Sequence, residues 1–158
     1  MSIIVLSVGK IKEKYFNDAI KEYLKRISRF TKVEVIEIKD EPEPKNASPA
    51  QIERTKQIEG ERLLSKITPD DFVIALAIKG EELSSESFAE RIKKALDSSR
   101  RIVFLIGGSN GLAENVLSRA NRELSFSSFT FPHQLMRVIL LEQLYRACKI
   151  NANERYHK

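Results

Sequence analysis

Apolar runs and helically spaced apolar positions alternate along the chain. Continuous or alternating apolar residues at 3–8, 33–38, 72–78, 102–106 and 124–126 predict five β-strands. Between and after them, apolar residues recur every three to four positions over 13–30, 48–67, 85–97, 112–120 and 134–150, which predicts five helices. This alternation is typical of an α/β fold, a mostly parallel sheet flanked by helices. Because no repeat or linker interrupts the 158 residues, we expect a single domain over 1–158.

The carboxyl ends of the predicted strands are the expected place for a ligand, as in other open parallel sheets. Three loops lie there, after Ile78, after Ile106 and after Phe126. The polar sequence Lys79-Gly80-Glu81-Glu82 predicts the end of the third strand. We therefore expect a binding site where these three loops meet.

The second of these loops begins with Gly107-Gly108-Ser109-Asn110-Gly111. Its glycines do not have the spacing of the dinucleotide-binding G-x-G-x-x-G pattern, and no Lys-Ser or Lys-Thr follows as in a phosphate-binding loop. The turn either serves only as a connection or lets a ligand approach the backbone closely, which adjacent glycines permit. No acidic residue lies in the turn, so we expect no metal there.

The third loop, Ser127-Ser128-Phe129-Thr130-Phe131-Pro132, combines hydroxyl groups and aromatic rings. One interpretation is a surface loop in which Thr130 caps the next helix. Leaving Phe126, Phe129 and Phe131 exposed would be unfavourable, however. We favour a loop folded around a planar, apolar ligand.

Candidate chemical groups follow this loop. His133 lies in the first turn of the last helix, where a histidine is either structural or catalytic, and Arg137 lies one turn further on the same face. The arginine needs a partner or water among its apolar neighbours. Because the helix has almost no polar face, we expect a homodimer. The tail Arg155-Tyr156-His157-Lys158 is either a frayed end or an arm that reaches a substrate or the neighbouring subunit.

The net charge of +5 is concentrated near the N-terminus. Residues 10–32 contain eight Lys or Arg against three Asp or Glu, which equals the whole excess. This segment is either a solvated helix face or a patch that binds nucleic-acid phosphates. The single cysteine, Cys148, excludes a disulfide framework or a zinc cluster. No apolar run has the length of a membrane span and no signal peptide is evident, so we expect a cytoplasmic protein without membrane contact.

Three segments together indicate a known family. They are Leu105-Ile106-Gly107-Gly108-Ser109-Asn110-Gly111, Phe131-Pro132-His133-Gln134-Leu135-Met136-Arg137 and the terminal Tyr156-His157-Lys158. Their order, at this chain length, resembles the ribosomal RNA large-subunit methyltransferase H family of the SPOUT superfamily. The resemblance extends from Val8-Gly9-Lys10 to the last residue.

The resemblance implies a SPOUT-type α/β fold whose C-terminal part forms a trefoil knot, an arrangement that sequence patterns would not suggest. It implies S-adenosyl-L-methionine as cofactor, no metal, a homodimer, and methylation of N3 of a pseudouridine in the 23S ribosomal RNA. By matching position, the cofactor contacts fall on Leu76, Gly107, Phe126, Ser127, Ser128, Phe129, Thr130 and Phe131.

Methyl transfer to a ring nitrogen requires alignment of donor and acceptor and removal of the weakly acidic N3 proton. Our hypothesis is that His133, Arg137, Tyr156 and His157 surround the target base. A histidine accepts the proton and Arg137 stabilises the developing anion, with the tail supplied by the same or the other subunit.

Two alternative classes remain at this point. A nucleotide-binding regulatory domain is disfavoured by the missing phosphate-binding motifs. An RNA-binding module without catalysis is disfavoured by the glycine turn and the aromatic loop. Preference for S-adenosylmethionine over ATP and NAD distinguishes the three classes.

Overall fold

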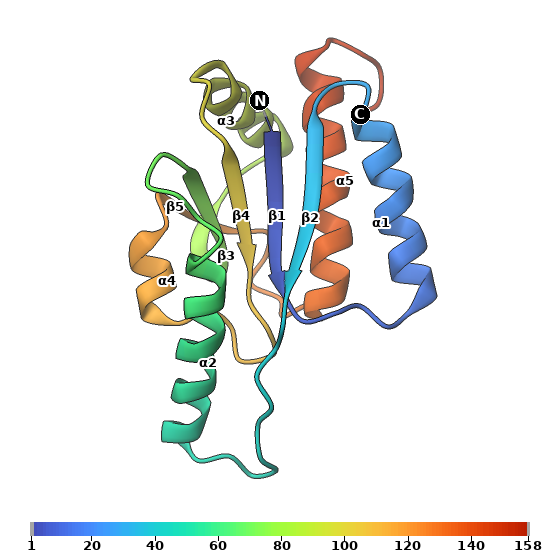
Figure 1. Ribbon diagram of the computed structural model, residues 1–158. Helices are drawn as coiled ribbons and strands as arrows, with labels where there is room; N and C mark the ends of the chain where they lie inside the picture. Colours follow the sequence, from blue (N-terminus) through green and yellow to red (C-terminus); the bar gives the residue numbers. More distant parts are fainter. Residues whose placement is uncertain (1, 158) are drawn as a thin grey trace.

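The computed structural model describes residues 2–157 as a layered α/β arrangement (Figure 1). The middle layer is a parallel sheet with strand order β2-β1-β4-β3-β5. Its strands are β1 (Ser2–Val8), β2 (Lys32–Ile38), β3 (Phe72–Glu82), β4 (Ile102–Ile106) and β5 (Arg122–Ser125). The helices are α1 (Lys14–Ile27), α2 (Pro49–Leu64), α3 (Ser85–Asp97), α4 (Glu114–Arg119) and α5 (His133–Asn151). The predicted fold class is confirmed.

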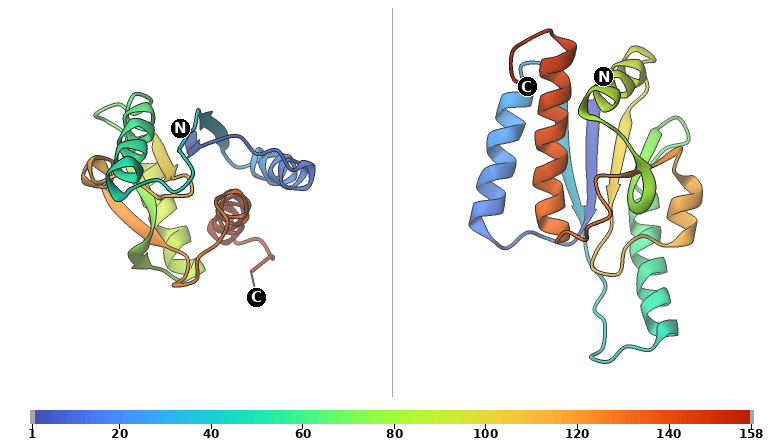
Figure 2. Two further views of the ribbon diagram at one scale, coloured as in Figure 1. Left: turned by 90° about the horizontal axis from the view of Figure 1, so that it is seen from below. Right: turned by 180° about the vertical axis from the view of Figure 1, so that it is seen from behind.

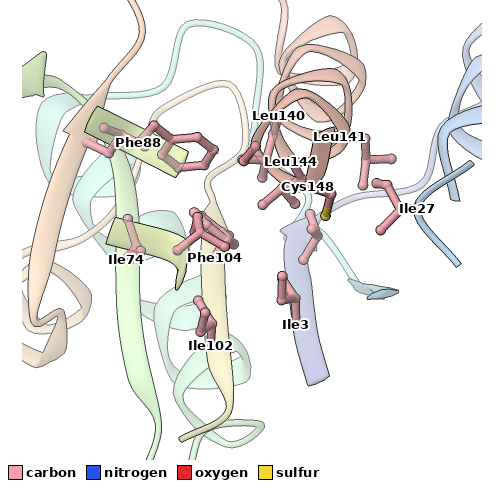
Figure 3. Close-up of a cluster of buried hydrophobic side chains, with 14 of the residues drawn as sticks. Ile3, Ile27, Ile74, Phe88, Ile102, Phe104, Leu140, Leu141, Leu144 and Cys148 are labelled. Atoms are coloured by element: carbon pink, nitrogen blue, oxygen red, sulfur yellow. The ribbon is translucent and has the colours of Figure 1, made fainter. Parts of the chain in front are cut away.

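Helices cover both faces of the sheet, which explains why β1 is apolar from Ile3 to Leu6 and at Val8. Figure 2 shows α5 between α1 and α3 on one face, whereas α2 and α4 pack together on the other. Successive side chains of a strand point to opposite faces. Ile3 and Val5 therefore join the core under α5, and Ile4 and Leu6 join the core under α2. Figure 3 shows the first core, where Phe104 of β4 lies near side chains of α3 and α5.

The third strand corrects one prediction from the sequence. The expected break at residues 79–82 is wrong, since β3 continues to Glu82. Leu76 and Glu81 both pair with Leu124 of β5, so residues 77–80 form a bulge outside the regular ladder. Gly80 is required there, because a Cβ atom on it would lie 2.7 Å from the backbone nitrogen of Leu124. The bulge leaves the backbone of 77–80 beside the carboxyl edge of the sheet.

The last helix crosses the molecule from one end of the sheet to the other. It begins at the carboxyl edge and runs back, so the C-terminus lies at the opposite end (Figure 1). The segment 126–132 brings the chain from the edge strand β5 to the start of α5. This connection places the first turn of α5 at the carboxyl edge, and the chain's tail away from it.

Candidate active site

A cavity of about 660 Å³ opens at the carboxyl edge of the sheet, which Figure 2 (left) views from below. It is bounded by the β3 bulge, the β4–α4 loop, the β5–α5 loop and the first turn of α5. The lining includes seven of the predicted cofactor residues, namely Leu76, Gly107, Phe126, Ser127, Phe129, Thr130 and Phe131. Ser128 is exposed and is not among them. Two of the three predicted loops, after Ile106 and after Phe126, therefore meet at one cavity, and residues 76–78 of β3 take the place of the third.

The chemistry of the lining limits the ligands that fit. Ile106, Leu124 and Met136 contribute apolar surface, while serine, threonine and asparagine side chains contribute polar groups. Within residues 2–157, no Lys, Arg, Asp or Glu lines this cavity. Its volume and mixed lining suit a planar organic ligand with polar edges. The lack of a cation in the lining disfavours a ligand that carries several phosphates.

The glycine turn closes tightly on itself. The Gly111 N–H donates a hydrogen bond to the Gly108 carbonyl (3.0 Å), and Gly111 has a φ of +81° that favours glycine. A Cβ on Gly107 would lie 2.7 Å from the carbonyl carbon of Gly111. Gly107 thus allows the two ends of the turn to touch, and this contact shapes one wall of the cavity.

The aromatic loop is held by its own serines. The Ser125 hydroxyl donates to the Ser127 carbonyl (3.0 Å), and the Phe129 N–H donates to Oγ of Ser127 (3.1 Å). The alternative in which Thr130 caps α5 is wrong, because the N-cap is Pro132 and no side chain caps this helix.

The expectation that the aromatic rings are sheltered holds for Phe126 and Phe131, which are half-buried, but is wrong for Phe129, which is 78% exposed. Ile78, on the β3 bulge, is also exposed at 57% and lines the same cavity. The mouth of the cavity is therefore apolar, which suits a bound ligand or a protein surface.

His133 stands between the first cavity and a second one, and lines both. Burial lowers the pKa of His133, and the nearby positive charge of Arg137 lowers it further. Glu13 and Asp40 act in the opposite direction. The imidazole is consequently neutral near pH 7 and able to accept a proton.

Arg137 has its predicted partner, but it lines neither cavity. Its side chain is 1% exposed, and Nη1 donates to Oε2 of Glu37 at 2.7 Å. Nη2 donates to the carbonyls of Val8 (2.7 Å) and Gly9 (2.8 Å). Burial lowers the pKa of Arg137, and the Glu37 carboxylate opposes this shift. The guanidinium thus holds the end of β1 against α5.

The tail folds back on α5 of the same chain, outside both cavities. The Tyr156 hydroxyl donates to Oε1 of Glu142 (3.1 Å), with the Arg146 guanidinium over its ring. His157 contacts Glu86 at 2.7 Å and Arg146 at 3.2 Å. Glu142 and Arg146, spaced i and i+4 on α5, form an ion pair. Tyr156 and His157 therefore do not join His133, and Lys158 lies outside the described residues.

The second cavity, about 470 Å³, was not predicted from the sequence. It is polar, and it shares Gly108, Ser109, Asn110 and His133 with the first cavity. Its carboxylates are Glu13, Asp40, Glu41, Glu43 and Glu59, and Lys10 and Lys12 lie at the same cavity. One signal was available, because Glu59 falls between the buried positions Thr55 and Leu63 on one face of α2.

The basic segment 10–32 is partly neutralised. Lys14 pairs with Asp18, Arg26 with Glu22, and Arg29 with Glu154. Lys21 and Lys25 are exposed and form no ion pair within residues 2–157. Over the same part of the chain, no cluster of three or more His, Cys, Asp or Glu could hold a metal, and no helix could cross a membrane.

Comparison with known proteins agrees with this geometry. The model of a family described as predicted SPOUT methyltransferases matches residues 1–157, so the chain is a SPOUT methyltransferase. The ribosomal RNA large subunit methyltransferase H of Carboxydothermus hydrogenoformans is 55% identical, and that of Bifidobacterium animalis subsp. lactis is 56% identical. Each alignment spans 159 positions and covers both chains completely. The chain therefore belongs to the large subunit methyltransferase H family, which confirms the resemblance.

Proposed function

We propose that the protein, as a single domain, transfers a methyl group from S-adenosylmethionine to N3 of a pseudouridine in large-subunit ribosomal RNA. The cavity without charged lining at the carboxyl edge carries this proposal, because it suits a nucleoside cofactor that has no phosphate. The relatives named as ribosomal RNA methyltransferases support the substrate class. The trefoil knot implied by the resemblance belongs to the same proposal.

The residues of the first cavity fit the cofactor. The apolar wall around Leu76, Ile106 and Leu124 would cover its adenine ring, and the loops 107–111 and 126–131 would contact its polar edges. When bound, the cofactor supplies an activated methyl group on a sulfonium. The protein's task is then to orient the acceptor base and to take up the N3 proton.

His133 is the proposed proton acceptor, because it lies between the two cavities and its pKa is lowered. The methylation rate should fall as the pH drops below 6.5 through the lowered pKa of His133. His133→Gln should be slower by about a hundredfold near neutral pH and lack this dependence, because general base catalysis contributes on that order. Single-turnover methylation between pH 5 and 8 measures both. An unchanged profile in His133→Gln would remove the histidine from proton transfer.

The tail enters this proposal through a second subunit. Tyr156 and His157 lie outside the cavities of their own chain, so they would complete the site only across a homodimer. Exposed Phe129 and Ile78 at the mouth of the cavity offer an apolar surface for such a contact. Arg137, by contrast, supports a positioning role through Val8 and Gly9, while its direct contact with the base stays a prediction.

The exposed lysines of α1 are proposed to contact ribosomal phosphates. Lys21→Glu with Lys25→Glu should weaken binding to the large ribosomal subunit by about tenfold and reduce its salt dependence, since each lost phosphate contact lowers the salt slope by about one. Lys66→Glu with Lys93→Glu is a matched control, because both lysines are exposed, form no ion pair within residues 2–157 and lie outside the basic segment. Binding isotherms at several salt concentrations provide the test. If the variant of Lys21 and Lys25 and the control show the same dependence of binding on salt, the basic segment is only a solvated helix face.

The function itself is tested by transfer of a tritiated methyl group to free ribosomal RNA, to the large subunit and to the whole ribosome, followed by mapping of the modified nucleotide. Calorimetry with S-adenosylmethionine, its demethylated product, ATP and NAD distinguishes the alternative classes. Preference for ATP or NAD would favour a nucleotide-binding regulatory domain. Binding of RNA without methyl transfer would favour a non-catalytic RNA-binding module.

A further inference from the structure

The polar cavity contains a buried carboxylate that forms no ion pair within the described residues 2–157. Glu59 of α2 is 6% exposed, and its Oε2 accepts a hydrogen bond from the Glu41 N–H (3.1 Å). Arg62, whose charge acts on Glu59, instead donates to the Glu41 carboxylate and to the Lys39 carbonyl. Burial raises the pKa of Glu59, which Asp40 and Glu43 reinforce and the Glu41 N–H and Arg62 oppose.

A purely structural role does not account for this carboxylate. The Glu41 N–H needs one acceptor oxygen, and a glutamine amide would provide it without a buried charge. Within residues 2–157, no hydrogen bond is formed to the other oxygen, Oε1. Residues that destabilise the fold in this way are expected at functional sites. Oε1 is thus an acceptor available to a molecule in the polar cavity.

Oε1 of Glu59 lies close to the first cavity, where the methyl donor is proposed to bind. A Cβ on Gly108 would lie 3.4 Å from Oε1, and Gly108 lines both cavities. A base that presents one ring nitrogen to the first cavity would therefore have its neighbouring edge close to Glu59. His133, which also lines both cavities, borders the same space.

The chemistry of the proposed substrate supplies the matching group. Pseudouridine and uridine share N3, flanked by two carbonyl groups, but pseudouridine carries an N1–H where uridine carries a C5–H. N1 and N3 are separated only by C2, so a group that reads N1–H must lie beside the methyl-transfer point. A protein group can distinguish the N1–H of pseudouridine from the C5–H of uridine only by accepting a hydrogen bond from it.

We propose that Glu59 is the specificity-determining residue, and that its Oε1 accepts a hydrogen bond from N1–H of pseudouridine. This inference rests on the proposed function. A uridine in the same position would leave a buried carboxylate facing a C–H group, which is unfavourable. Discrimination thus arises from one desolvated acceptor beside the methyl-donor cavity.

Glu59→Gln tests this inference with minimal change of shape. The amide oxygen must still accept from the Glu41 N–H, so the amide NH2 group, a donor, faces the cavity. The variant should methylate pseudouridine about tenfold more slowly, the equivalent of about 1.4 kcal/mol, and uridine at nearly the wild-type rate. Glu61→Gln is the matched control, because Glu61 is an exposed carboxylate on the same helix.

The measurement is single-turnover methyl transfer to two preparations of unmethylated large ribosomal subunits, which carry pseudouridine or uridine at the mapped position. Calorimetric binding of S-adenosylmethionine and thermal melting should match the wild type, or melting should occur at a higher temperature. An unchanged preference, or an equal loss on both substrates, would overturn the role of Glu59. If the wild-type protein methylates neither preparation, the proposed function itself is wrong and this inference is lost with it.

The pH dependence of the preference gives a second readout. As the pH falls through the raised pKa of Glu59, its carboxyl becomes a donor, so the wild-type ratio of the two rates should decrease. Protonation of His133 affects both substrates and cancels in the ratio. The other charged groups at this cavity are Lys10, Lys12, Glu13, Asp40, Glu41 and Glu43, with Arg62 next to them on α2. A ratio that still varies in Glu59→Gln would assign the effect to one of them and overturn the assignment.

Discussion

Gly107→Ala is expected to lower the affinity for S-adenosylmethionine by about thirtyfold, since overpacking of a tight contact costs about 2 kcal/mol. The added Cβ would lie 2.7 Å from the carbonyl carbon and 2.8 Å from the carbonyl oxygen of Gly111. Both are backbone atoms, so no side chain can rotate away to make room. The β4–α4 loop must then move, and it forms one wall of the cavity.

Gly111→Ala separates this effect from the mere addition of a methyl group. No atom lies within 4 Å of a Cβ at Gly111, but its φ of +81° is strained for alanine. This variant should lose about 1 kcal/mol of unfolding free energy and keep most of its affinity. Calorimetric titration with chemical denaturation measures both quantities. Equal affinity losses in the two variants would show that the contact between Gly107 and Gly111 does not shape the site.

The pattern of apolar and polar residues was sufficient to predict most of the strands and helices that position the site. A strand buried on both faces needs mostly apolar residues; β4 has them at every position and β1 at all but Ser2 and Ser7. Because parallel strands end at the same edge, the ends of the two predicted strands already placed the loops 107–111 and 126–131 together. The bounds of the helices followed from their apolar spacing in the same way.

Contacts between residues distant in the sequence were beyond such reasoning. The β3 bulge depends on Leu124, which takes Leu76 and Glu81 in turn as partners. The polar cavity forms only when the loop after β2 meets α2 and the glycine turn. Residues 40–46 have the composition of an ordinary loop, and nothing local shows that residues 40–43 line the same cavity as Glu59. Local patterns therefore predicted most of the lining of the first cavity and missed the polar cavity.

The position of Arg137 illustrates the same limit. The sequence required a partner for a cation on an apolar helix, and Glu37 is that partner, 100 residues earlier. Nothing in the sequence indicates that the backbone carbonyls of Val8 and Gly9 accept the other hydrogen bonds of Arg137. Arg137 thus links β1, β2 and α5 in this structure, while its predicted contact with the target base stays a prediction.

Arg137→Met should consequently lower the free energy of unfolding by about 3 kcal/mol, because removing a buried guanidinium leaves its backbone acceptors unsatisfied. The losses are one hydrogen bond to the partly exposed Glu37 and two to backbone carbonyls, at a side chain that is 1% exposed. Arg146→Met is the control on the same helix. Its pair with Glu142 and its contacts with Tyr156 and His157 are partly exposed, so a smaller loss is expected. Urea denaturation compares the two.

The outcome also decides between the two roles of Arg137. If Arg137 positions the end of β1, Arg137→Met should reduce both the free energy of unfolding and methyl transfer. Glu37→Gln should then lower the free energy of unfolding less in Arg137→Met than in the wild type, because the two side chains act as a pair. If Arg137 contacts the base instead, Arg137→Met should reduce methyl transfer and leave the free energy of unfolding unchanged. If Arg137→Met unfolds at the wild-type urea concentration yet no longer transfers methyl groups, the guanidinium must leave Glu37 during the reaction. The buried network at the end of β1 would then be a resting arrangement of the site.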